Sequence, residues 1–405
     1  MPAADQQSRR WRVAFTATLL LAMTAGTMMQ FVLGVLAPFI TADLGLSRAQ
    51  LGSLSTLFFA VGAFASPFAG RIVDRVGGRP TLLGTFVLSG AGLAAMAGAW
   101  AYVPLLATMV IAGCGIALIN PVTNQLIAVH LPRGEQGVVT GVKQSGVQVG
   151  AFLGGLTLPP LALALGWRAA TLATVAVALV GVVATRLVVP APAGLDGGRQ
   201  AAQRVAGGGA FVRWLAGYAF LMGAGVSAAA AFLVLYAVEA LGLSEGRAGF
   251  AAALMGGVGI LARILWGRAA EWTATSTVPL LILAVTSVVA QGLVWGAVAA
   301  GEWLLWLGAA AFGATAGSWN AVGMLAIVRE VDRSATGRAS GIVQSAFYGG
   351  LVVTPIAFGA TVDATGAYHV GWAGVTVAFL AATVLAATWH VRDRRDARAP
   401  ATPPG

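Results

Sequence analysis

The chain alternates between long apolar stretches and short polar connections along its whole length. A helix that crosses the hydrocarbon core of a bilayer needs about 20 mainly apolar residues, so each stretch of that length predicts a membrane-spanning helix. The stretches that qualify are residues 13–39, 49–70, 80–99, 102–129, 136–163, 168–189, 213–238, 247–267, 278–299, 303–328, 338–362 and 369–390. These twelve spans predict an all-α membrane protein with both termini on one side of the bilayer.

Composition supports the same class of protein. Of the 405 residues, 58% are hydrophobic and 9% are charged, whereas an average soluble domain has about 25% charged residues. A soluble fold of this size could not cover its surface with polar groups. The formal net charge of +10 could indicate nucleic acid binding, but the basic residues fall between the apolar stretches rather than in one patch. We therefore expect the lipid bilayer, and no nucleic acid, as a partner.

The basic residues lie mainly on alternate connections. Arg48, Arg168 and Arg247 fall on one side of the expected bilayer, Lys143 and Arg263 fall within spans, and the other 19 of the 24 fall on the second side. Such an excess of basic residues marks the cytoplasmic side. The pattern predicts a multi-pass protein of the inner or plasma membrane with both termini in the cytoplasm.

A Gly-rich segment at 190–212 separates two sets of six spans, and the two sets resemble each other. A shift of 200 residues lays Asn120-Pro-Val-Thr-Asn124 on Asn320-Ala-Val-Gly-Met324, and Gly141-Val-Lys-Gln-Ser145 on Gly341-Ile-Val-Gln-Ser345. A duplicated six-helix unit explains both matches. The expected organisation is an N-terminal six-helix bundle at 1–189, a cytoplasmic linker at 190–212, a C-terminal six-helix bundle at 213–391 and a cytoplasmic tail at 392–405.

The connection between spans 2 and 3 reads Gly70-Arg71-Ile-Val-Asp74-Arg75-Val-Gly77-Gly78-Arg79, and a degenerate copy, Gly267-Arg268-Ala-Ala-Glu271, follows span 8. This pattern and its position resemble the G-x-x-x-D-R-x-G-x-R signature of the major facilitator superfamily. The resemblance covers essentially the whole chain. It implies a secondary transporter, not an enzyme, in which two bundles related by pseudo-twofold symmetry expose a midplane solute site to each side in turn.

The same resemblance implies a gating role for this connection. Asp74 is expected to face the positive N-terminal end of span 11, near Thr336, and Glu271 could do the same at span 5. The other interpretation is that the arginines only hold the connection inside by their charge. The candidate gating residues are Gly70, Arg71, Asp74, Arg75, Gly77, Arg79, Gly267, Arg268 and Glu271.

Span 5 contains the only lysine of the chain, Lys143, whereas the other 23 of the 24 basic residues are arginine. An ionisable residue within a span is costly and is a functional candidate by default. A lone lysine in an arginine-rich chain suggests that a compact, deprotonatable ammonium is required there. The other interpretation is that its long stem carries the charge to the cytoplasmic interface.

Polar side chains within the spans supply further candidates. Gln144 and Gln148 share one face of span 5, and Asn120 and Asn124 repeat the same spacing on span 4. The candidate binding residues are Lys143, Arg263, Gln144, Gln148, Asn120, Asn124, Gln30, Asn320, Gln344 and Tyr348. Any of the uncharged ones could instead hold neighbouring helices together.

Arg263 in span 8 precedes Gly267 by four residues. It resembles the span-8 arginine of the monocarboxylate and oxalate carriers of the superfamily, which implies that its guanidinium binds a carboxylate. Monocarboxylate carriers have an acid one turn earlier, where this chain has Gly259. The other interpretation is that Arg263 reaches the nearby cytoplasmic face.

Span 5 also contains a series of glycines, Gly137, Gly146, Gly150, Gly154 and Gly155. The series resembles the antiporter signature of the drug exporters of the superfamily, except that Ala151 stands at the proline position. Close packing of a neighbouring helix would also explain the glycines.

Spans 1 and 4 contain no Asp or Glu, so the membrane interior offers a cation and no counter-ion. This favours an anionic or neutral solute over a cationic drug or an acid-dependent proton–sugar symport. The leading hypothesis is transport of a small organic anion, a carboxylate. The alternatives are an exporter of neutral or amphipathic compounds and a transporter-like receptor.

Other chemistry is not indicated. His130, His369 and His390 lie far apart in the sequence near span ends, so we expect no metal site. No G-x-x-x-x-G-K-[ST] loop is present, so we expect energy from gradients and no cofactor. The remaining expected partners are the solute and a coupling ion or counter-substrate, and we expect a monomer.

Overall fold

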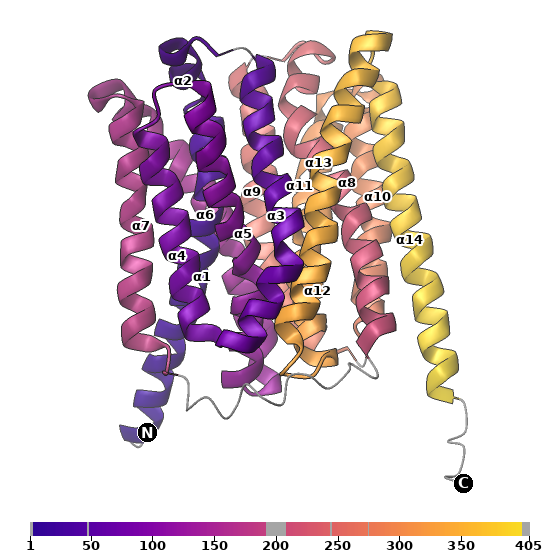
Figure 1. Cartoon of the computed structure of the whole chain (residues 1–405). Helices are drawn as coiled ribbons and strands as arrows, with labels where there is room; N and C mark the ends of the chain where they lie inside the picture. Colours follow the sequence, from indigo (N-terminus) through magenta and orange to yellow (C-terminus); the bar gives the residue numbers. More distant parts are fainter. Residues whose placement is uncertain (1–2, 47, 192–207, 244, 274, 399–405) are drawn as a thin grey trace.

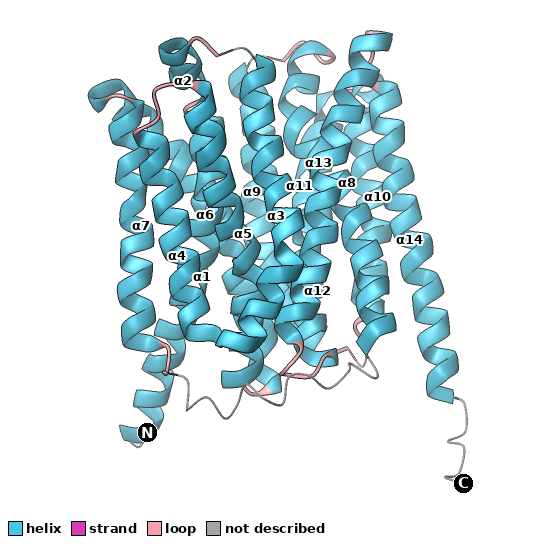
Figure 2. Cartoon of the chain, in the orientation of Figure 1, coloured by secondary structure: helices cyan, strands magenta, loops and turns pink. Residues whose placement is uncertain are grey.

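The structure is a computed structural model that describes residues 3–46, 48–191, 208–243, 245–273 and 275–398. Within these residues the only regular elements are helices (Figure 2). The long helices run side by side, and both ends of the chain lie at the same end of the bundle (Figure 1). We call this end the terminal side and the other end the opposite side.

The first half forms six membrane-length helices, the first of which is extended by a short helix. Its elements are α1 (Ala3–Val35), α2 (Ala37–Leu44), α3 (Arg48–Val76), α4 (Gly78–Ala97), α5 (Tyr102–His130), α6 (Arg133–Leu165) and α7 (Trp167–Val188). The helices correspond in order to the first six predicted spans.

The second half repeats this plan. Its elements are α8 (Gly208–Glu239), α9 (Glu245–Glu271), α10 (Thr277–Ala300), α11 (Glu302–Ala314), the 3-10 turn η2 (Ala316–Ser318), α12 (Trp319–Glu330), α13 (Thr336–Thr365) and α14 (His369–Arg398). With α11, η2 and α12 counted as one span, the described residues form the predicted two bundles of six. Most of the predicted linker, residues 192–207, lies outside the described residues.

In the part of the chain that the structure describes, eleven of the twelve spans are long and apolar enough to cross a membrane on their own, and α6 is the exception. Helix α6 carries Arg133, Glu135, Lys143, Gln144 and Gln148. Its Lys143 and Gln144 are buried, so this face of α6 lies in the protein interior rather than toward lipid.

The predicted span at 303–328 is present as one span, Glu302–Glu330, but it is not one continuous helix. The backbone leaves the helical conformation at Thr315, with φ −117° and ψ −84°. The break lies in Gly313-Ala-Thr-Ala-Gly317, where two glycines lower helix stability. A run of apolar residues does not show such a break, because hydropathy is the same for a straight and a broken span. The break leaves the carbonyl group of Gly317 free to accept hydrogen bonds from side chains.

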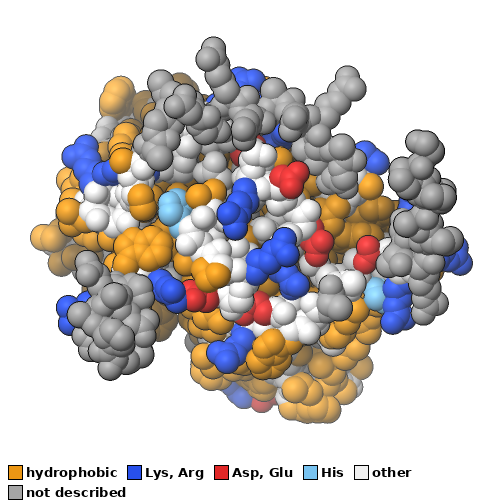
Figure 3. All heavy atoms as spheres, turned by 90° about the horizontal axis from the view of Figure 1, so that it is seen from below, with side chains coloured by type: hydrophobic (Ala, Val, Ile, Leu, Met, Phe, Trp, Pro, Cys, Tyr) orange, Lys and Arg blue, Asp and Glu red, His pale blue; other side chains and the backbone are white. Residues whose placement is uncertain are grey.

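The two halves meet mainly along two helix pairs, α3 with α13 and α6 with α9, while α5 also contacts α13 and α12 of the second half and α6 also contacts α12. On the outer surface many large apolar side chains are exposed, including Phe64 at 76%, Leu163 at 77% and Leu187 at 81%. Lipid would cover such a surface. Charged side chains instead gather on the terminal side, where Figure 3 shows blue and red groups across the middle of the face.

Candidate solute site and gates

Lys143 lies on α6 in the interior, with 0% of its surface exposed. Its Nζ donates hydrogen bonds to Asn120 Oδ1 at 3.2 Å, Thr123 Oγ1 at 2.6 Å and Asn124 Oδ1 at 2.5 Å. The three acceptors lie within five consecutive residues of α5 and share its α6-facing side. The ammonium group therefore stays inside the protein and does not extend to the membrane interface.

The same asparagines connect the two halves. Asn120 Nδ2 donates to Gln344 Oε1 at 2.7 Å, and Asn124 Nδ2 donates to Ser340 Oγ at 2.8 Å, both on α13. Gln144 Nε2 donates to Asn120 Oδ1 at 3.0 Å. This network places the lysine at the junction of the two halves.

No carboxylate contacts Lys143 among the described residues. The ion pairs of the described chain are peripheral: Arg12 with Glu135, Arg168 with Asp43, and Arg247 with Glu302. The three partners of Lys143 are neutral oxygens. A buried ammonium without a counter-ion is costly.

Arg263, on α9, is also buried, with 7% of its surface exposed. Its Nε and Nη2 donate to the carbonyl oxygen of Gly317 at 2.9 and 2.7 Å, and its Nη1 donates to the carbonyl oxygen of Gln144 at 3.0 Å. The guanidinium therefore connects the break between α11 and α12 to α6 of the other half, next to Lys143. It does not extend to the terminal surface.

The remaining candidate binding residues differ in placement. Tyr348 is buried, and its hydroxyl lies 3.5 Å from the carbonyl oxygen of Ile116 on α5. Gln30, Gln148 and Asn320 are partly exposed. Of the ten candidates, the structure joins five through side-chain hydrogen bonds, namely Lys143, Asn120, Asn124, Gln144 and Gln344.

Sequence reasoning missed Thr123 and Ser340, which both belong to this network. Neither had a distinctive signal, because threonine and serine within membrane helices commonly bond their own backbone. The position of Thr123 beside Asn124 was the only indication available.

The glycines of α6 serve close packing where the structure shows a neighbour. A Cβ added at Gly146 would overlap the carbonyl oxygen of Leu20 on α1, and one at Gly150 would lie 3.3 Å from the ring of Phe31. A Cβ at Gly155 would meet nothing within 4 Å. Gly146 is thus required for the close approach of α1 to α6. This packing requirement explains the glycine without a direct role in transport.

On the terminal side, α3 is attached to the first turn of α13. Asp74 Oδ1 accepts a hydrogen bond from the Gly337 amide at 3.0 Å, and Oδ2 accepts one from the Arg338 amide at 2.9 Å. These amides are unpaired donors at a helix N-terminus, where a negative charge is stabilised. A Cβ at Gly70 would overlap the carbonyl oxygen of Gly337. The two helices are therefore in backbone contact here.

The pseudo-symmetric contact joins α9 to α6. Glu271 Oε1 accepts a hydrogen bond from the Gly137 amide at 2.6 Å, near the start of α6. A Cβ at Gly137 would overlap the carbonyl oxygen of Gly267, and one at Gly267 would overlap that of Gly137. The halves are thus closed against each other on the terminal side at two related positions.

The basic residues of the motif lie around these contacts. Arg71 and Arg268 are exposed and lie over the rings of Phe68 and Trp272, at 5.6 and 5.8 Å from the ring centres. Arg79 Nη2 donates to the carbonyl oxygen of Arg186 at 2.9 Å, and Arg75 is exposed. Gly77 has φ +93°, a conformation that favours glycine. It makes the tight turn between α3 and α4.

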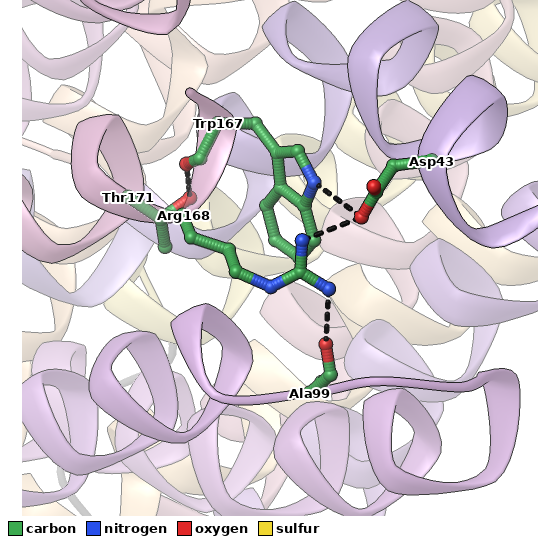
Figure 4. Close-up of polar contacts among 5 residues, drawn as sticks. All are labelled: Asp43, Ala99, Trp167, Arg168 and Thr171. Atoms are coloured by element: carbon green, nitrogen blue, oxygen red, sulfur yellow. Dashed lines mark hydrogen bonds and ion pairs between the residues drawn. The ribbon is translucent and has the colours of Figure 1, made fainter. Parts of the chain in front are cut away.

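On the opposite side, hydrogen bonds join elements of the same half. Asp43 Oδ2 accepts hydrogen bonds from Trp167 Nε1 at 3.0 Å and from the guanidinium of Arg168 (Figure 4). The Nη2 of Arg168 also donates a hydrogen bond to the carbonyl oxygen of Ala99 at 3.1 Å. The hydrogen bonds from Arg168 and Trp167 lower the pKa of Asp43. In the second half, the Tyr368 hydroxyl donates to Glu239 Oε2 at 2.6 Å. Each set connects the first span of a half to its last.

Two bundles joined through a buried polar network and closed on one side define a membrane transporter. The chain matches the sequence model of the Major Facilitator Superfamily over residues 18–321, and it belongs to this family. It is a multi-pass membrane protein of a transporter family and not an enzyme.

Curated relatives match over limited segments. The chain is 29% identical over 136 residues to a hexuronate transporter of Bacillus subtilis (strain 168), and 31% identical over 147 residues to a gallate transporter of Pseudomonas putida. These matches cover 34% and 35% of this chain and 32% of each relative. The chain thus matches about a third of the length of either relative.

Solved structures match along nearly the whole chain. The human organic anion transporter MFSD10 (TETRAN) aligns with a TM-score of 0.75 and 15% identity, over 95% of this chain and 100% of that one. FucP in the outward conformation aligns with a TM-score of 0.69 and 17% identity, over 93% and 99%. At these identities the likeness concerns the fold alone.

Proposed function

We propose that this protein is a secondary transporter of small organic anions, and that the carboxylate of the solute binds near Lys143. The observation that carries the proposal is an ammonium group that is fully buried at the junction of the halves with neutral partners only. The named substrates of the two curated relatives, hexuronate and gallate, are both carboxylates. An incoming carboxylate would supply the missing counter-charge.

The surrounding residues have complementary roles in this proposal. Asn120, Asn124, Gln144 and Gln344 orient the solute through amide groups. Arg263 donates three of its five N–H groups to backbone oxygens, which leaves two for a carboxylate. Gln30, Gln148, Asn320 and Tyr348 would contact the rest of the solute.

In this proposal, alternating access depends on the two contacts on the terminal side. In our proposal this side faces the cytoplasm of an inner or plasma membrane. The bundles at 1–189 and 213–391 rock about the central network while the linker at 190–212 connects them. Opening requires Asp74 to leave the N-terminus of α13 and Glu271 to leave that of α6. The closed contacts seen here would then separate, and the solute would be released on that side.

A solute panel tests the proposal. The purified protein is heated with glucuronate, galacturonate, gallate and benzoate, and with the neutral controls glucose and benzyl alcohol. A ligand that binds only the folded state stabilises it by about 2.7 kcal/mol at 100 times its Kd. We expect a higher unfolding midpoint with at least one carboxylate and none with the neutral analogues, together with uptake of that carboxylate into proteoliposomes.

Two variants test whether binding and uptake depend on Lys143. Lys143→Gln should remove both the thermal shift and at least nine-tenths of the uptake, because the counter-charge for the carboxylate is lost. Arg186→Gln, which removes an exposed arginine on α7, controls for the change in net charge and should retain both. Carboxylate uptake that is unaffected by Lys143→Gln would contradict the proposal.

A further inference from the structure

The hydrogen bonds around Lys143 match those of an ammonium group. An ammonium has three N–H donors, and three oxygens lie 2.5–3.2 Å from Nζ. The amide nitrogens of Asn120 and Asn124 are used by Gln344 and Ser340. Both asparagines therefore present their oxygens, which only accept, to the lysine.

The third partner, Thr123, is different because a hydroxyl can either donate or accept. Its Oγ1 lies 2.6 Å from Lys143 Nζ and 2.6 Å from the carbonyl oxygen of Ile119. Beside an ammonium, the hydroxyl accepts from Nζ and donates to Ile119. Beside a neutral amine, it can turn its hydrogen to the nitrogen lone pair, while the two amine hydrogens remain on Asn120 and Asn124.

Ile119 tolerates this rotation. Its carbonyl oxygen lies within α5 and also accepts the helical hydrogen bond from the Thr123 amide. The buried groups around Nζ thus keep partners in both protonation states. A site that only had to hold a permanent cation would not need a reversible hydroxyl at this position.

We propose that Lys143 carries the coupling proton of the transport cycle and that Thr123 is the positioning residue that stabilises it in both forms. This inference rests on the proposed transport of organic anions. On the loading side the amine takes one proton as the carboxylate binds, forming an N–H bond. On the other side the carboxylate leaves, the same N–H bond breaks and the proton follows. One monoanion and one proton cross together, so the net charge moved is zero.

The surroundings favour release of the proton when the solute is absent. Helix α9 presents Arg263, a second positive charge, through the Gln144 carbonyl. Helix α13 presents Ser340 at Asn124 and Gln344 at Asn120. Helix α1 presents Thr24 at Gly146, and α12 presents Met324 at Asn124.

Other charges around α6 lie at its ends. Helix α7 carries Arg168, which is partly exposed, and Arg186, which is exposed. The carboxylates of Asp74 and Glu271 are bonded to backbone amides of α13 and α6 on the terminal side. No acid of the described chain therefore balances an ammonium in the empty carrier, and losing the proton removes that cost.

Proton entry into proteoliposomes tests this inference. The full-length protein is reconstituted with a pH-sensitive dye inside, and glucuronate and gallate serve as the two probes. We expect internal acidification with a ratio near one proton per monoanion, and uptake that rises when the outside is made acidic. Anion uptake without acidification would overturn the inference and leave anion transport intact. Failure of both probes, and of the other two carboxylates of the panel, to enter would overturn anion transport and this inference with it.

Variants then locate the proton. Lys143→Arg keeps a positive charge that does not titrate, so proton-driven uptake should fall at least tenfold more than exchange of labelled for unlabelled anion. Equal losses of uptake and exchange, or retained proton entry, would contradict the role of Lys143.

Thr123→Val removes a charge-assisted hydrogen bond to the ammonium and a weaker one to the amine. The cation therefore loses more, and the pH of half-maximal uptake should move about one unit towards acid. Thr123→Ser should restore the midpoint. The matched control is Thr185→Val on α7, where a fully buried threonine bonds the carbonyl oxygen of Gly181 four residues earlier. An unchanged midpoint in Thr123→Val, or an equal shift in Thr185→Val, would overturn the role of Thr123.

Discussion

At the scale of single residues, the shape of Arg263 matters as much as its charge. Its planar fork bonds Gly317 on one side and Gln144 on the other. Lysine has one nitrogen on a flexible stem and cannot reproduce this geometry. Arg263→Lys should therefore lose at least one of the three hydrogen bonds to these buried carbonyl oxygens, at a cost of about 1–3 kcal/mol.

Thermal unfolding of purified Arg263→Lys checks this, and we expect its midpoint several degrees below that of the natural protein. Arg247→Lys is the matched control, because that arginine is largely exposed and pairs with Glu302 at the surface. Equal midpoints for the two variants would show that the bonds of Arg263 to the broken helix contribute nothing to stability.

The candidate residues show what a sequence can reveal at this scale. Lys143 was evident because it is the only lysine and interrupts an apolar stretch. The bonding of Arg263 to a backbone carbonyl was not evident, because it depends on a helix break that hydropathy does not detect. Thr123 was missed because its role comes from its distance to Lys143, which no spacing within α5 encodes.

At the scale of helices, the charge of Asp74 holds α3 to the N-terminus of α13. An acid at such a position contributes about 0.3–1 kcal/mol at an exposed site and up to about 2 kcal/mol when partly buried. Asp74→Asn keeps the size of the side chain and removes the charge. The population of molecules open on the terminal side should then rise roughly fivefold if the closed contact loses about 1 kcal/mol of stability.

The labelling rate of a cysteine at Ser66 measures this opening, since Ser66 is fully buried on α3 where Gly341 of α13 passes. The measurement uses a Cys114→Ala background and a water-soluble maleimide. Asp393→Asn, a change on α14 near the chain end, should leave the rate unchanged. A rate in Asp74→Asn no higher than in this control would remove the gating role of the charge.

Backbone contact between helices makes a second prediction at this scale. A Cβ at Gly341 would overlap the carbonyl oxygen of Ser66, so Gly341→Ala should prevent α3 and α13 from closing and reduce uptake more than tenfold. Gly84→Ala on α4 is the matched control, because its Cβ would meet nothing within 4 Å. Full activity in Gly341→Ala would mean that closure does not need this contact.

At the scale of the whole molecule, the apolar pattern was sufficient to predict the fold class. Hydropathy, the 200-residue repeat and the Asp74 motif each indicated two related bundles, because the bilayer restricts long apolar stretches to helices. The ties on the opposite side, such as Asp43 with Trp167 and Arg168, were not predictable. They join residues more than 120 positions apart without any local sequence signal.

The ties on the opposite side connect the first and last spans within each half. The hydrogen-bond network around Lys143 and the contacts of Asp74 and Glu271 instead connect the two halves. We therefore expect the two bundles to move as rigid bodies. A covalent link between halves should then block transport, and a link within one half should not. Cysteines at Ala63 and Ser345 join α3 to α13, where the Ser345 hydroxyl bonds the Ala63 carbonyl oxygen. Cysteines at Gly92 and Ala112 join α4 to α5 inside the first half, where a Cβ at Gly92 would lie 2.9 Å from that of Ala112.

In a Cys114→Ala background, oxidation or a short bifunctional reagent should stop uptake only for the first pair, and removal of the link should restore it. If transport continued after the 63–345 link had formed completely, the solute would have to pass without separation of α3 from α13. A block of equal size by the 92–112 link would show instead that the first bundle must change shape internally, because that link does not hold the halves together.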